Sequence, residues 1–184
     1  MHRFDLIPNL FHCFETDEPF ARCSDCKKPL HDKPNGYLVQ KAFQHGEPIM
    51  EVALCYDCHQ QLQADYSEES RDAIINFHLD HADLPNRLEQ LHDQPTDSLT
   101  PWIGSCLTCQ RSLGECDEYI LATQCIQDVM VFGEVPVMVC GTCMQTLVSQ
   151  LSEKTRDEND RWRQRCLPMA PAQPDDGPKV GLPF

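Results

Sequence analysis

The sequence predicts an α+β fold built from two copies of one small module. Three features recur in the same order in each half of the 184 residues. Each half has a Cys-x-x-Cys pair, then two strand-like apolar runs, then a second Cys-x-x-Cys pair that leads into a helical pattern. The recurrence of these three features in the same order indicates duplication of one supersecondary unit.

Composition and charge narrow the class of protein. The hydrophobic share is 41% including 12 cysteines, and aromatics are 8%, so less apolar material is available than in an ordinary globular domain. Lys and Arg number 15 against 29 Asp and Glu, giving a formal net charge of −14, which argues against phosphate-driven binding. No run has the ~18 apolar residues of a membrane span, and no signal peptide is visible. The sequence therefore predicts a cytoplasmic protein, in which dense cysteine favours metal over disulfides.

Eight of the cysteines form four Cys-x-x-Cys pairs. Twenty-eight residues separate the first two pairs, and thirty separate the last two. Two such turns can complete a tetrahedral shell of four thiolates, which suits Zn²⁺. The sequence therefore predicts two zinc ions per chain, with no other cofactor. The predicted metal ligands, in two sets of four, are Cys23, Cys26, Cys55 and Cys58, and Cys106, Cys109, Cys140 and Cys143.

In the first half, residues 37–39 and 49–54 read as strands, and Gly46 reverses the chain between them. A helical pattern follows the second cysteine pair. Ser67 is followed by two glutamates, which is typical of an N-cap and predicts a further helix. The expected buried side of that helix is apolar: Ile74, Ile75 and Phe77.

The second half repeats this layout. Residues 119–121 and 135–139 read as strands, and Gly133 is the expected turn between them. A helical pattern again follows the second cysteine pair. Residues 152–157 match residues 67–72 at a constant offset of 85, with Ser, Glu, Arg and Asp shared, so the capping pattern after the second cysteine pair recurs in the second half.

These patterns divide the chain into five segments. Residues 1–19 form an N-terminal segment, residues 20–82 the first zinc module, and residues 83–102 a connector. Residues 103–166 form the second zinc module. Residues 167–184 are rich in proline and are predicted to be a disordered tail.

The order of knuckle, β-hairpin and helix resembles the treble-clef zinc fingers over residues 20–80 and 103–166. This resemblance implies one structural zinc in each half. It also implies that the second thiolate pair lies near the positive end of a helix, where amide groups and the helix dipole favour anionic sulfur. The whole chain also resembles uncharacterised bacterial zinc-finger proteins, a likeness that implies no function.

Other chemistries fit the cysteine pairs less well. Rubredoxin-type iron sites have Gly after each knuckle, where this chain has Lys27, His59, Gln110 and Met144, so iron is the less favoured metal. Cys55 to His59 matches the c-type haem attachment pattern, but the second half lacks it. A redox dithiol usually stands alone on a βαβ frame, whereas four pairs in two matched modules favour metal.

Six further residues could carry chemistry. His78 and His81 lie three apart on a predicted helix, but no third ligand is placed beside them, so a solvated helix is expected. The remaining cysteines are expected to be small buried hydrophobes, with a third site or a regulated thiol as the alternative. They are Cys13, Cys116, Cys125 and Cys166.

No catalytic constellation stands out in the sequence. Catalytic zinc has three protein ligands and an open position, whereas both predicted sites are closed. We therefore expect a non-enzymatic zinc-binding protein that serves as a protein–protein interaction or adaptor module. The alternatives are a nucleic-acid-associated regulator, which the net charge disfavours, and a thiol redox or metal sensor.

Overall fold

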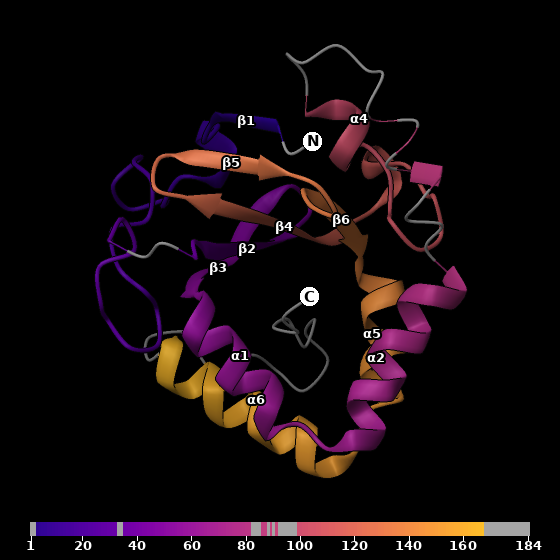
Figure 1. The fold of residues 1–184 in the computed structure, drawn as a ribbon. Coiled ribbons are helices and arrows are strands. Elements are labelled where there is room, and N and C mark those ends of the chain that lie inside the picture. The colour runs from indigo at the N-terminus through magenta and orange to yellow at the C-terminus, as the bar shows by residue number, and fades with distance from the viewer. Residues whose placement is uncertain are drawn as a thin grey trace.

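The computed structural model describes residues 3–32, 35–81, 86, 87, 89, 91 and 99–167. One sheet forms the upper layer, and helices from both halves form an arch below it (Figure 1). The mixture of one sheet and helices confirms the coarse fold class. Most of the predicted connector, and all of the predicted tail except Leu167, lie outside the described residues.

The sheet contains strands from both halves, in the order β1-β5-β4-β2-β3, with β6 also paired to β4. All of these pairings are antiparallel. The strands are β1 (Arg3–Leu6), β2 (Tyr37–Gln44), β3 (Glu47–Cys55), β4 (Glu118–Ile126), β5 (Val129–Phe132) and β6 (Val137–Cys140).

The central pairing of the sheet joins the two halves. Strand β2 pairs with β4 from Tyr37↔Cys125 to Gln44↔Glu118. Tyr37 is the first residue of β2, and Tyr119, 82 residues further on, is the second residue of β4. Gln40 pairs with Ala122, which also lies 82 residues further on. When a residue of one half pairs with the equivalent residue of the other half, a two-fold axis passes between them, as in an isologous dimer interface. The chain therefore has an internal pseudo-two-fold axis through the β2–β4 pair.

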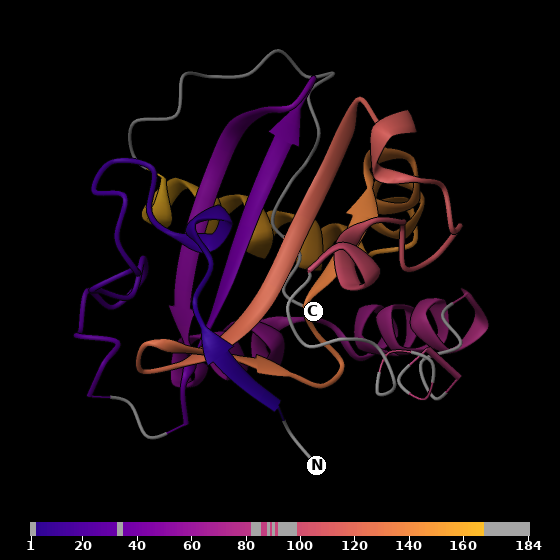
Figure 2. The ribbon, with the colours of Figure 1, turned by 90° about the horizontal axis from the view of Figure 1, so that it is seen from above.

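The helices cross between the halves beneath this sheet. Helix α1 packs against α6, and α2 packs against α5, so each half contributes one helix to each side of the arch (Figures 1 and 2). The helices are α1 (Tyr56–Asp65), α2 (Glu68–His81), α4 (Thr100–Ile103), α5 (Gly141–Ser149) and α6 (Glu153–Cys166), with 3-10 turns η1 (Asn9–Phe11) and η2 (Leu113–Glu115).

The turns of the two hairpins differ from each other. His45 and Gly46 have φ of 52° and 81°, which suits a tight reversal between β2 and β3 and agrees with the predicted turn. The prediction for Gly133 is wrong, because β4 turns into β5 at Gln127 and Asp128. Gln127 takes the left-handed conformation, with φ of 52°. The second half thus has an additional strand, β5, ahead of β6.

The buried side chains form one core that draws on both halves. Trp162, Tyr37 and Tyr66 are among the largest fully buried side chains. Phe77 is buried as expected, but Ile75 is 56% exposed, so that part of the predicted helix face is wrong. Among the described residues, no helix is long and apolar enough to cross a membrane.

Two candidate metal centres

The first centre brings together the two cysteine pairs of the first half. Cys23 and Cys26 come from the loop before β2, while Cys55 ends β3 and Cys58 lies in the first turn of α1. The four Sγ atoms all lie within 4.8 Å of one another. The Sγ atoms of Cys26 and Cys55 are 3.8 Å apart. This group could hold one metal ion.

The second centre repeats the first with the cysteines of the second half. Cys106 and Cys109 precede β4, Cys140 ends β6, and Cys143 lies in the first turn of α5. These four Sγ atoms also lie within 4.8 Å of one another. The Cys109–Cys140 Sγ distance of 3.7 Å matches its counterpart in the first centre. All eight residues named from the sequence are thus brought into two groups of four.

Each knuckle contains one left-handed residue directly after its second cysteine. Lys27 and Gln110 both have φ of 60°, a conformation that usually favours glycine. Their N–H groups donate to the carbonyls of Cys23 and Cys106, at 3.0 Å in both cases. The knuckle therefore forms without glycine. The missing glycine does not by itself distinguish zinc from iron.

Backbone hydrogen bonds tie each knuckle to the strand that carries the second cysteine pair. The N–H of Ser24 donates to the Ala53 carbonyl at 2.7 Å, and the Ser24 hydroxyl accepts from the Ala53 N–H at 3.0 Å. In the second half, the N–H of Leu107 donates to the Met138 carbonyl at 2.8 Å. These contacts join each knuckle to the strand that carries the second cysteine pair of its centre.

Amide groups also face the sulfur atoms. The Cys55 N–H donates to Cys23 Sγ at 3.4 Å, and the Cys140 N–H donates to Cys106 Sγ at 3.3 Å. Cys55 and Cys140 are the N-caps of α1 and α5. The thiolates therefore meet the positive end of a helix, where unpaired N–H groups and the helix dipole stabilise negative charge.

The thiols of each centre ionise unequally. Burial opposes the ionisation of Cys109, but the Arg111 N–H and the neighbouring thiols outweigh it and lower the pKa of Cys109 to about 7. The pKa of Cys26 is lowered in the same way, against burial, by the Lys28 N–H and its neighbours. Burial and the adjacent sulfurs raise the pKa of both helix cysteines, Cys58 and Cys143. The positive charge of a bound divalent cation would offset both the burial and the repulsion between thiolates, so all four thiols could release their protons on binding it.

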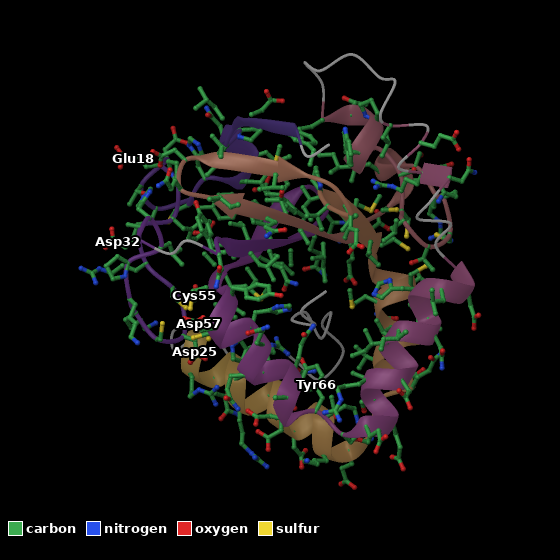
Figure 3. All side chains as sticks on the ribbon, in the orientation of Figure 1. Glu18, Asp25, Asp32, Cys55, Asp57 and Tyr66 are labelled. Atoms are coloured by element: carbon green, nitrogen blue, oxygen red, sulfur yellow. The ribbon has the colours of Figure 1, made fainter. Side chains whose placement is uncertain are left out.

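Two acidic residues, Asp25 and Asp57, are neighbours in sequence of cysteines of the first centre. Figure 3 shows Cys55 at the start of α1, with Asp25 and Asp57 near it in this view. The Asp25 carboxylate accepts from Arg165 of α6 at 3.4 Å. The end of the last helix of the second half therefore lies beside the metal site of the first half.

The four remaining cysteines have different surroundings. Burial raises the pKa of Cys125 and of Cys166 to about 12, as expected for small buried hydrophobes. Cys13 and Cys116 are only half-buried. Burial, and after it the sulfurs of Cys106 and Cys109, raise the pKa of Cys116. Cys166 follows Arg165, which contacts Asp25 of the first knuckle at 3.4 Å. A fifth cysteine thus lies near each centre. Sequence spacing does not predict the position of Cys166, because this cysteine belongs to the second half and lies near the centre of the first half.

The prediction for His78 and His81 falls partly outside the described residues, because the side chain of His81 is not described. Among the described side chains, groups of metal-ligating residues form only at the two cysteine centres. Burial lowers the pKa of His78, which agrees with a packed imidazole more than with a solvated helix face.

The chain matches no protein-family model, no curated protein and no solved structure with which it was compared. Its function must therefore be argued from the two cysteine centres and from the surface around them.

Proposed function

We propose that this chain is a non-enzymatic protein in which each cysteine centre holds one structural Zn²⁺. The observation that carries the proposal is the spacing of the sulfurs. A tetrahedral shell with Zn–S bonds of about 2.3 Å has S···S edges of about 3.8 Å. One Sγ pair in each centre, at 3.8 and 3.7 Å, matches that edge, and all four sulfurs of each centre lie within 4.8 Å of one another.

The donor set supports a structural role. Four thiolates close the coordination shell, whereas a catalytic zinc has an open position for water or substrate. Bound zinc would supply a crosslink among knuckle, strand and helix in each half. The order of these elements supports the resemblance to treble-clef fingers, and thiol ligands fit the reducing cytoplasm.

We further propose that the chain presents an acidic surface to a protein partner, as an interaction or adaptor module. A Zn²⁺ ion with four thiolates carries −2, so two centres would change the formal net charge from −14 to −18. A surface of this charge suits a basic protein and opposes a phosphate backbone. A nucleic-acid-associated regulator therefore remains the less favoured alternative.

Two experiments test the proposal. Elemental analysis of protein purified without added metal is expected to give about two zinc ions and little iron per chain, while one zinc or none would contradict it. Affinity capture from the native host, with the zinc-loaded chain as bait, is expected to retain a protein that elutes with salt. The Cys26→Ser and Cys109→Ser baits serve as controls and are expected to retain less of it.

A further inference from the structure

A cavity of about 770 Å³ is lined by strands of the sheet and by the helices α1 and α2. This volume falls within the range of small-molecule pockets in proteins, about 300–1,000 Å³. Strands β2 and β4, which pair across the two halves, both contribute to the lining. None of the eight cysteines of the metal centres is among the described lining residues. The cavity is therefore a feature separate from the two centres.

The polar side chains of the lining come mainly from α1 and from the middle of the sheet. His59 and Gln63 lie about one turn apart on α1 and both line the cavity. Gln40 of β2 and Gln124 of β4 line it as well. Because Gln40 pairs with Ala122, Gln124 is its diagonal neighbour, about 7–8 Å away on the same face of the sheet. Each glutamine amide offers both a hydrogen-bond donor and an acceptor.

The α2 side of the cavity is mainly aliphatic. Helix α2 lies on the other side of the arch from α1 (Figure 1), and it lines the cavity with Ile74, Ile75 and Leu79. Val131 of β5 and Val137 of β6 add further aliphatic lining. A molecule in the cavity therefore meets amide and imidazole groups toward α1 and aliphatic side chains toward α2.

The lining carries almost no charge. Among the described lining residues there is no Lys or Arg, and Glu134, which is exposed, is the one acid. Burial lowers the pKa of His78, so its imidazole is uncharged at neutral pH. A carboxylate or phosphate entering the cavity would lose its hydration without gaining a cation from this lining, which is costly. The cavity therefore suits an uncharged molecule.

The polarity of this lining is reversed relative to the duplicated helices. His59 and Gln63 are polar, whereas their counterparts in α5 are apolar. Ile75 and Leu79 are apolar, whereas their counterparts in α6 are polar. These counterparts, 85 residues further on, are Met144, Val148, Asp160 and Gln164, and none of them is among the described lining residues. The architecture thus accepts either polarity at these positions, and the observed arrangement is particular to the helices that face the cavity.

We propose that this cavity binds an uncharged, largely apolar small molecule that carries one hydrogen-bonding head group of the amide type. Its apolar body packs against Ile75 and Leu79, which are 56% and 72% exposed, and their burial supplies affinity. Its head group bonds to the side-chain amides of Gln63 and Gln124, which are half-buried, and these amides supply selectivity. This role goes beyond the structural zinc sites and uses no cysteine, so its test and the zinc measurements can fail separately.

Methyl NMR of the full chain, as purified with its metal, tests the proposal with one ring system and three head groups. The probes are naphthalene-2-carboxamide, which is uncharged, 2-naphthoate, which is negative, and 2-naphthylmethylammonium, which is positive. We expect the carboxamide to shift the methyl signals of Ile74 and Ile75 saturably, and to leave those of Ile7 and Ile103, which do not line the cavity, unchanged. Both charged probes are expected to bind about tenfold more weakly. The absence of saturable shifts, or equal or tighter binding of either charged probe, would overturn the proposal.

A substitution in α1 tests the selection of the head group. Gln63→Val copies the apolar residue of α5 and is expected to weaken binding of the carboxamide about tenfold. Binding of 2-methylnaphthalene, which has no polar head, is expected to stay unchanged in this variant. An equal loss for the two probes would show that Gln63 acts through the shape of the cavity, and it would contradict the proposed contact.

A substitution in α2 tests the apolar contact, with the Ile74 methyl as reporter. Ile75→Asp/Leu79→Gln copies the α6 residues and is expected to weaken both the carboxamide and 2-methylnaphthalene about tenfold. The matched control, Asp160→Ala/Gln164→Ala, changes the equivalent positions of α6 and is expected to leave both affinities unchanged. Equal affinities in the α2 variant and in this control would contradict the assigned site.

Discussion

Ser67 and Ser152 hold equivalent positions in the two halves, and their side-chain oxygens lie 2.8 Å apart. The contacts around them are reciprocal. The Ser67 N–H donates to Thr155 Oγ1 at 3.0 Å, and the Ser152 N–H donates to Ser70 Oγ at 2.9 Å. Each serine also accepts from the backbone three residues on in its own helix, at 3.2 and 3.3 Å. The starts of α2 and α6 therefore cap each other across the pseudo-two-fold axis.

We predict that Thr155→Val destabilises the whole chain by about 1–3 kcal/mol. Valine keeps the volume of this buried side chain but leaves the Ser67 N–H without its acceptor, which costs about that much. Chemical denaturation measures the effect. Thr146→Val, on the exposed side of α5, is the matched control and should change stability by less than about 0.5 kcal/mol. Equal effects of the two variants would refute the cross-capping role.

Lys41 is the second unusual buried polar residue, and we predict that Lys41→Met destabilises the fold by about 3 kcal/mol. Its ammonium lies 3.2 Å from a Glu51 oxygen and 3.6 Å from the centre of the Phe14 ring, and it donates to the His12 carbonyl. The substitution removes the cation that balances Glu51. Denaturation midpoints compare this variant with Lys28→Met, an exposed control. If Lys41→Met left the free energy of unfolding unchanged, the contacts of the Lys41 ammonium would not be what holds residues 12–14 to the sheet.

Local spacing was enough to predict the cysteine centres, while the contacts between the halves were not predictable from it. A Cys-x-x-Cys pair specifies its own turn, so the ligand sets follow from sequence separations of two and about thirty residues. The β2–β4 pairing depends instead on which strand edges meet. Many strands have the same alternation of apolar and polar residues, so this pattern does not identify the partner of β2. The expected turn at Gly133 is wrong because the chain already reverses at Gln127, whose left-handed conformation the sequence does not indicate. The expected burial of Ile75 is wrong because an exposed apolar residue on a helix can have the same spacing as a core residue.

Loss of one metal is predicted to affect both halves. The sequence alone favours modules that respond separately, but the continuous sheet and shared core lead us to expect one cooperative transition. Cys26→Ser and Cys109→Ser should each lower zinc content to about one per chain and lower hydrogen-exchange protection on both sides of the β2–β4 pair. Cys13→Ser, outside both centres, is the control. Two separate calorimetric transitions, or protection lost in one half alone, would support independent modules.

Nucleic-acid binding is predicted to be undetectable at physiological salt. A chain with a formal charge of −14, more negative still with two thiolate-bound zinc ions, has no net cationic surface from which a phosphate backbone would release counterions. Fluorescence anisotropy with labelled double- and single-stranded DNA and with RNA checks this. A micromolar complex whose affinity falls steeply with salt would favour the nucleic-acid-associated alternative over the protein partner.

The measurement that tests the central claim most directly is X-ray absorption at the zinc edge of the protein as purified. If each centre is a closed thiolate shell, the spectrum will show four sulfur neighbours per zinc at about 2.3 Å and no nitrogen or oxygen neighbour. Elemental analysis of the same sample should give two zinc ions per chain. A nitrogen or oxygen atom in the coordination shell would contradict the closed structural sites proposed for both halves, and iron in place of zinc would contradict the metal assigned to them.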